Sequence, residues 1–177
     1  MLYLSKMYFY MRKEMTWKEL AVFLILYGSM LIIEQNRKTR MSYIRLGLSV
    51  LLIVYITLLR RESGNINVEL IPFKDISLKM AYHDFLNIIL FCPFGYELTK
   101  IKERTQKSRI GIYGFMLSLF IESMQMLFQC GNFETEDILF NGMGTLLGKK
   151  FYECCEYIKN RKENNDENND DRTLKKG

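Results

Sequence analysis

The residues best suited to chemistry are polar side chains that repeat at helical spacing inside apolar sequence. Ser118, Glu122 and Gln125 follow one another at i, i+4 and i+7, so they share one face of a helix. Asp137 and Asn141 share a face of the next apolar stretch in the same way. An acidic group at the centre of a membrane helix costs about 2.5–3.5 kcal/mol on insertion scales. Such groups therefore face the interior of a bundle and indicate a functional site.

Two kinds of chemistry are open to these residues. A buried carboxyl group can act as general acid or base, which makes Glu122 and Asp137 candidate catalytic residues. Buried amides and hydroxyls can instead bind a ligand, or join helices through hydrogen bonds that average about 0.6 kcal/mol. The candidate ligand-binding residues are Asn87, Ser118, Glu122, Gln125, Asp137 and Asn141.

The elements that must position these residues are apolar helical stretches. Of the 177 residues, 49% are hydrophobic and 25% charged, and the two classes are segregated along the chain. The sequence predicts an all-α, polytopic integral membrane bundle of about five transmembrane helices. An interfacial segment (1–17) precedes the bundle, and a polar tail (156–177) is expected to be disordered in the cytoplasm. The predicted spans are 18–34, 43–60, 83–99, 110–129 and 137–155.

Several apolar runs are shorter than the roughly 20 residues of a typical span, so a soluble helical bundle is an alternative. The second and fourth runs are apolar all round, and Tyr and Trp lie at the ends of the runs, which favours the membrane. Most of the 25 Lys and Arg residues lie in the 34–45 and 97–109 loops and the tail. The positive-inside rule therefore predicts a cytoplasmic C-terminus and an outside N-terminus. If the first run lies on the surface, four spans remain and the N-terminus is cytoplasmic.

Helix rise places the polar residues of three spans in the same half of the membrane. Asn87 and Asp137 lie near the entry of the third and fifth spans, and Glu122 lies near the exit of the fourth. Gly144 and Gly148 form a GxxxG motif that lets backbones approach closely, and we expect this face to pack against the fourth span. The residues with an expected role in helix packing are Pro93, Gly95, Gly144 and Gly148.

The chain shows no metal or cofactor motif. Cys92, Cys130, Cys154 and Cys155 form no CxxC pair, and the single histidine, His83, has no ligand partner at a recognisable spacing. We expect the cysteines to have packing roles, with no metal and no cofactor. His83 could ligate or titrate, but a lone histidine beside an interface usually does neither. The net charge of +5 resides in loops and the tail, so no nucleic-acid partner is expected.

Three segments together resemble the VanZ-like family over roughly residues 56–150. They are Asn87-Ile-Ile-Leu-Phe-Cys-Pro-Phe-Gly95, the Ser118/Glu122/Gln125 helix, and Phe133-Glu-Thr-Glu-Asp-Ile-Leu-Phe-Asn-Gly-Met-Gly-Thr-Leu-Leu-Gly148. The Leu-Ile-Pro-Phe turn at 70–73 resembles a further element of the family. Three positions depart from the pattern: Glu134 replaces the usual Asp, Val68-Glu69 precede the turn where Asn is usual, and Gly131-Asn132 stand where a basic residue is common.

The resemblance implies a cell-envelope membrane protein linked to low-level resistance to the lipoglycopeptide teicoplanin. An outward-facing polar pocket would suit a membrane lipid, a lipid-linked cell-wall precursor or a lipoglycopeptide. The alternatives are an intramembrane enzyme on a lipid-linked substrate, with Glu122 as general acid or base, and a transporter or channel. The enzyme alternative lacks an evident nucleophile or Arg cluster, and the transporter lacks an inverted repeat. The oligomeric state is left open.

Overall fold

The computed structural model describes residues 28, 40–59, 68–69, 78–102, 109–129 and 133–174. Within these ranges the chain is almost entirely helical, which confirms the all-α class. Its helices are α3 (Arg40–Val54), continued by the π-helical turn η1 (Tyr55–Leu59), α4 (Leu78–Ile101), α5 (Ile110–Leu127) and α6 (Thr135–Leu174). Apart from Gly28, the predicted first span and the N-terminal segment lie outside the described residues, as does the 70–73 turn.

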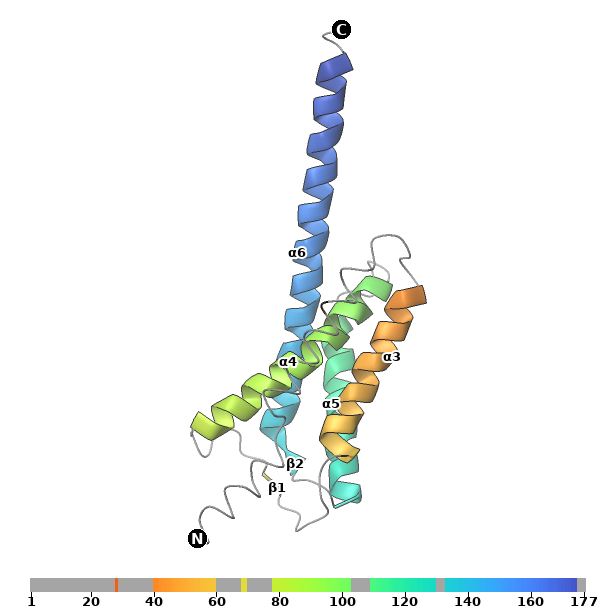
Figure 1. Ribbon diagram of the computed structural model, residues 1–177. Helices are drawn as coiled ribbons and strands as arrows, with labels where there is room; N and C mark the ends of the chain where they lie inside the picture. The colour runs from red at the N-terminus through yellow and green to blue at the C-terminus, as the bar shows by residue number, and fades with distance from the viewer. Residues whose placement is uncertain are drawn as a thin grey trace.

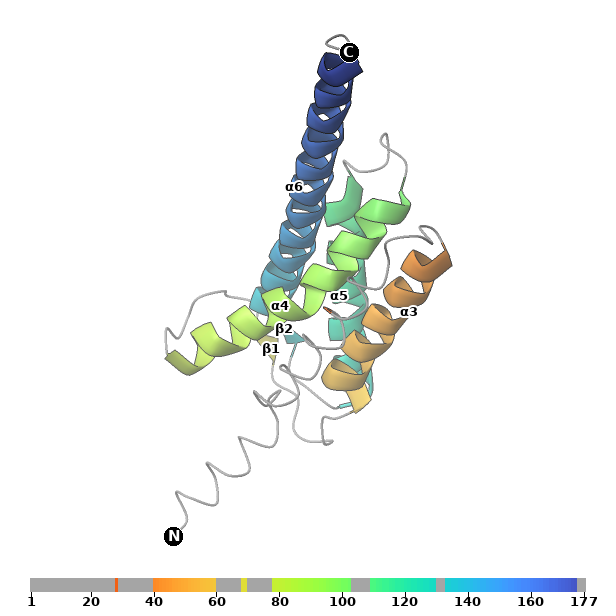
Figure 2. The same ribbon diagram turned by 45° about the horizontal axis from the view of Figure 1, so that its top comes forward.

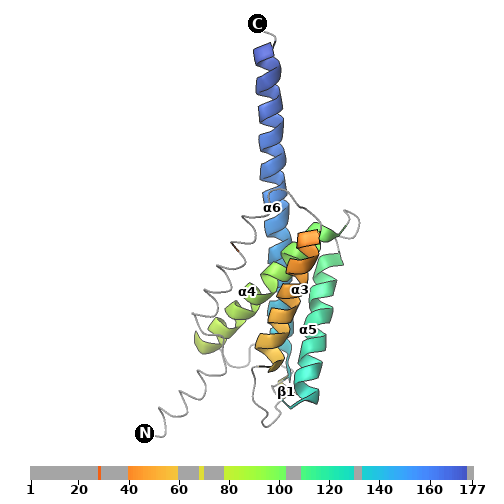
Figure 3. The ribbon, with the colours of Figure 1, turned by 45° about the vertical axis from the view of Figure 1, so that its right-hand side comes forward.

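Successive helices run in alternating directions. α3 and α5 end near the two short strands, whereas α4 and α6 begin there (Figure 1, Figure 3). α4 lies across α6 and packs along it, α5 packs against α6 as well, and α3 packs against α4. This arrangement gives the bundle two ends, and the end with the strands is called the strand end below.

The strand end holds a parallel pairing of β1 (Val68–Glu69) with β2 (Phe133–Glu134). Val68 pairs with Phe133 and Glu69 with Glu134. Neither strand was predicted, because two residues are too few to show an alternating pattern. The pairing joins the segment before α4 to the segment before α6. β2 comes after a sharp turn at the end of α5, where Gln129 has a φ of 54° in the left-handed region.

Polar residues occupy much of the interior, and apolar residues much of the surface. Among the described residues, the main apolar cluster comprises Ile53, Leu90, Phe91, Phe94, Leu98, Ile110 and Ile121. Large apolar side chains are exposed on every helix, including Leu51, Ile112, Phe120, Leu147 and Phe151. The segments Met41–Leu58 and Ile110–Leu127 are long and apolar enough to cross a membrane, which fits a membrane protein. Crossing by α4 and α6 stays a prediction.

α6 differs from the prediction at its C-terminal end. The tail from residue 156 was expected to be disordered, but the structure continues α6 to Leu174 as a single 40-residue helix that projects beyond the bundle (Figure 1, Figure 2). The prediction rested on the tail's inability to bury a core, whereas an exposed helix needs none. Local ion pairs such as Lys159–Glu163, 3.6 Å apart at i, i+4, support it instead.

The glycine face of α6 also differs from the prediction. A Cβ atom at Gly144 would collide with the backbone carbonyl of Ile88, and one at Gly148 with that of Cys92. Both collisions are with α4, so the GxxxG motif packs against the third predicted span and not the fourth. α4 takes part through Gly95, where a Cβ would collide with the carbonyl of Thr145. Small residues on both helices therefore set this close approach.

Candidate functional site

The six residues predicted to bind a ligand, called the polar cluster below, all lie in the half of the bundle nearer the strand end. They are Asn87 of α4, Ser118, Glu122 and Gln125 of α5, and Asp137 and Asn141 of α6. All six are buried, with exposed fractions of 9% or less. The i, i+4, i+7 spacing on α5 therefore identified an interior face. Three helices contribute to one polar interior.

Two hydrogen bonds connect α6 to its neighbours within the polar cluster. The Asn87 side-chain amide donates to Asp137 Oδ1 over 2.7 Å, joining α4 to α6. The Asn141 amide donates to Ser118 Oγ over 2.9 Å, joining α5 to α6. The face of α6 that carries Asp137 and Asn141 thus contacts both α4 and α5.

Glu122 and Gln125 each form a hydrogen bond with a segment outside α6. Glu122 Oε2 accepts a hydrogen bond from the backbone N–H of Glu134 in β2 over 3.1 Å. The Gln125 amide donates to the carbonyl oxygen of Thr57 in η1 over 3.2 Å. Glu122 therefore holds the strand segment against α5, while Gln125 connects α5 to η1. A direct bond between Glu122 and Asn141, one alternative from the sequence, is not the arrangement observed.

Asn141 has an unused hydrogen-bonding capacity. Its Oδ1 atom is buried and has no hydrogen-bond partner among the described residues. The Asn141 side chain is only 3% exposed, and the nearby Thr145 hydroxyl bonds the Asn141 backbone carbonyl, not this oxygen. A buried acceptor without a donor costs about 1–3 kcal/mol. A ligand hydroxyl, amide or ammonium that reached this oxygen would recover that cost.

His83 is a neighbour that sequence reasoning missed. Its Nδ1 atom lies 3.4 Å from Asp137 Oδ1, the same oxygen that Asn87 bonds. The sequence suggested that this histidine had no partner, because only separations along the chain were considered. A usable signal existed: His83 and Asn87 are at i, i+4 on one face of α4, and both lie near the end where α6 begins.

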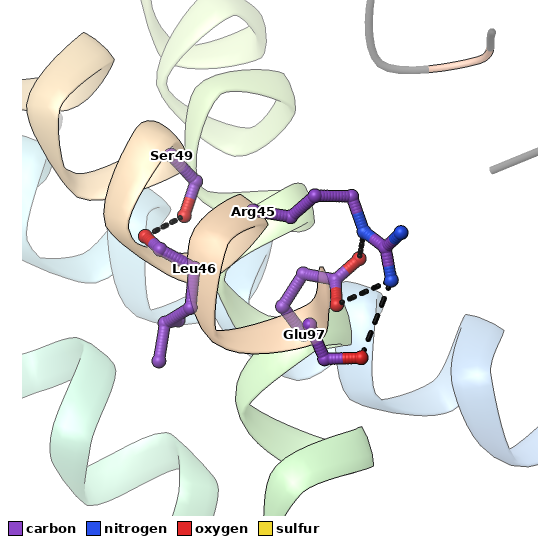
Figure 4. A network of polar contacts seen from close by, with 5 residues as sticks. Arg45, Leu46, Ser49 and Glu97 are labelled. Atoms are coloured by element: carbon purple, nitrogen blue, oxygen red, sulfur yellow. Dashed lines mark hydrogen bonds and ion pairs between the residues drawn. The ribbon is translucent and has the colours of Figure 1, made fainter. Parts of the chain in front are cut away.

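A second missed feature is a buried ion pair at the opposite end of the bundle. Arg45 of α3 and Glu97 of α4 are paired through Nε–Oε1 and Nη2–Oε2 contacts of 2.7 and 3.2 Å (Figure 4). Arg45 also donates to Ser42 Oγ over 3.3 Å. The two charges are 3% and 0% exposed. The predicted topology put both residues on the same side of the membrane, so their opposite charges could have indicated the pairing.

Comparison with known proteins gives a family but no closer relative. The VanZ/LLP1 family model matches residues 20–156, which covers the described helices α3, α4 and α5 and the first part of α6. No curated protein and no solved structure shows a significant match. The family match includes every residue of the polar cluster. The chain therefore belongs to the VanZ/LLP1 family.

Proposed function

We propose that this chain is a multi-pass protein of the bacterial cell membrane that binds an amphiphile at the polar cluster. The ligand is a membrane lipid, a lipid-linked cell-wall precursor or a lipoglycopeptide. Through that binding, the protein contributes to low-level teicoplanin resistance. The bundle has about five spans, the polar cluster faces outward, the N-terminus lies outside and the C-terminus is cytoplasmic.

The distribution of side chains supports a membrane environment. In a soluble bundle, buried positions are mainly apolar and large exposed apolar patches are rare. Here the fully buried set includes Glu97, Glu122 and Gln125, while Leu51, Ile112 and their neighbours face outward. Lipid chains would cover such a surface without the cost that water imposes.

The ends of the bundle support the orientation. Basic residues dominate the loops at the end opposite the strands, where α6 projects with its many charged side chains. The positive-inside rule assigns this end to the cytoplasm. The strand end, with the polar cluster, then faces outward, where a cell-wall precursor or lipoglycopeptide would be met.

The observation that carries the ligand proposal is the buried Oδ1 atom of Asn141, which has no hydrogen-bond partner in the described part of the chain, inside a cluster built by three helices. A cluster that served only to join helices would pair its buried acceptors within the protein. The surrounding apolar surface matches a lipid tail, and the polar interior matches a headgroup that can donate hydrogen bonds. An amphiphile satisfies both requirements.

The test is teicoplanin susceptibility of a Gram-positive host that expresses the chain. Wild type is compared with empty vector, Glu122→Gln and Asn141→Ala at matched membrane levels. Glu122→Gln removes a carboxyl group but keeps an oxygen to accept the Glu134 N–H. Ser123→Ala is the control, because among the described residues the Ser123 hydroxyl bonds only the Leu119 carbonyl of its own helix, over 2.7 Å.

We expect the inhibitory concentration to rise with wild type and Ser123→Ala, and to return to the vector value in both cluster variants. An unchanged rise in the two cluster variants would assign the polar cluster a purely structural role. No rise with well-inserted wild type would exclude the resistance function.

A further inference from the structure

We propose that His83, Asp84 and Asp137 form a binding site for a divalent transition-metal cation of the Zn²⁺ type at the strand end. Each residue offers one ligand atom, and these three atoms lie within 4.8 Å of one another. The donor set is one imidazole nitrogen and two carboxylate oxygens. Imidazole favours Zn²⁺ and similar metals over Mg²⁺ and Ca²⁺, which prefer all-oxygen sites.

The geometry is close to that of a bound ion. Zinc bonds to nitrogen and oxygen are about 2.0–2.2 Å long, so two ligand atoms on one ion lie at most about 4.2 Å apart. His83 Nδ1 and Asp137 Oδ1, at 3.4 Å, already meet this limit. The longest separation needs to shorten by only about 0.6 Å, which rotation of the half-buried His83 and Asp84 side chains can supply.

The charges around the three residues provide an independent reason. Asp84 is partly buried and lies near the carboxylates of Glu136 and Asp137 and near His83. Asp137 and Glu136 are buried, with exposed fractions of 3% and 8%. Crowded carboxylates in a partly buried place favour a bound cation, and a dication compensates two carboxylates better than the hydrogen bond from Asn87 can.

Asn87 prepares Asp137 for this role. Its amide donates to Asp137 Oδ1 over 2.7 Å and so fixes the orientation of the carboxylate. Hydrogen bonds from a second layer of residues commonly orient metal ligands in this way. Asn141, with its buried unpartnered oxygen, follows Asp137 by one turn on the same face of α6. The site therefore shares Asp137 with the polar cluster, but it does not depend on an amphiphile being bound there.

The experiment is a calorimetric titration of the full-length protein in detergent with Zn²⁺. Every protein tested carries Cys154→Ser and Cys155→Ser, because these two adjacent, exposed thiols would bind zinc themselves. In this background we compare the parent with His83→Gln, Asp84→Asn and Asp137→Asn. Glu153→Gln, which changes a partly exposed carboxylate elsewhere on α6, is the matched control.

We expect one Zn²⁺ per chain, with affinity at least tenfold weaker in each of the three ligand variants and unchanged in Glu153→Gln. Zinc should also raise the melting temperature of the parent but not that of Asp137→Asn. Absence of stoichiometric binding to the parent, or equal affinity in parent and Asp137→Asn, would overturn the proposal. The melting temperatures of the metal-free proteins show whether a variant that no longer binds zinc is still folded. The teicoplanin susceptibility test reports separately on the amphiphile.

Discussion

Single residues decide whether the buried charges of this bundle stabilise or destabilise it. Arg45 and Glu97 are almost completely buried, and two nitrogen–oxygen contacts join them. Removing one partner of such a pair leaves a charge uncompensated, whereas replacing both with apolar residues is often neutral. The pair connects the beginning of α3 to the end of α4, so its loss affects how these helices dock.

Arg45→Met alone, or Glu97→Met alone, should lower the free energy of unfolding by about 3–5 kcal/mol. The double variant should recover most of that loss, because no unpaired charge remains. Unfolding of the purified protein in detergent, followed by circular dichroism, measures the three values. Additive losses in the double variant would show that the two side chains act independently.

Ser118→Ala is expected to destabilise the protein by about 0.6–1.7 kcal/mol, the range measured for hydrogen bonds between membrane helices. The Ser118 hydroxyl is the acceptor for Asn141 of α6, so its removal leaves a buried amide without that partner. Ser123→Ala removes a hydroxyl that bonds only its own helix and should cost much less. Equal losses in the two variants, measured by the same unfolding assay, would contradict this interpretation.

At the scale of the elements, the contact between α4 and α6 depends on the absence of side chains at a few positions. A Cβ at Gly144 or Gly148 would meet backbone atoms of α4, which cannot move aside as a side chain can. Gly142 lies on the same helix, yet a Cβ there would meet nothing within 4 Å. These three glycines therefore separate the effect of packing from that of helix propensity.

Gly144→Ala and Gly148→Ala should each lower the unfolding free energy by about 1–3 kcal/mol or more, because overpacking forces the backbones apart. Gly142→Ala should leave it unchanged or raise it by up to about 1 kcal/mol, since alanine favours a helix over glycine. Thermal unfolding in one detergent compares the three variants directly. A loss in Gly142→Ala as large as in the others would show that the contact with α4 is not the cause.

The sequence predicted the helices and their interior faces better than the partners of those faces. Periodicity placed Ser118, Glu122 and Gln125 on one buried face, because polar residues that share the interior face of a helix recur every three or four positions. The helix predicted to pack against Gly144 and Gly148 was wrong. A face of small residues allows any neighbouring helix to approach closely, so it does not indicate which helix packs there. His83 was missed because its contact with Asp137 depends on how α4 meets α6.

At the scale of the whole molecule, the alternating helices determine which end of the bundle meets which side of the membrane. Gln129 follows α5 at the strand end, whereas Cys155 lies in the second half of α6, which runs away from the strand end. Both side chains are exposed. Under the proposed orientation, the first faces outward and the second faces the cytoplasm.

This arrangement can be tested with a membrane-impermeant thiol reagent on intact cells. In a chain whose four cysteines are replaced by serine, Gln129→Cys should be labelled without permeabilisation. A chain that retains only Cys155 should be labelled only after the membrane is opened. The reverse pattern would invert the orientation, and labelling of both sites in intact cells would contradict a fixed multi-pass topology. An N-terminal tag on the same proteins then distinguishes five spans from four, since it lies outside with five and in the cytoplasm with four.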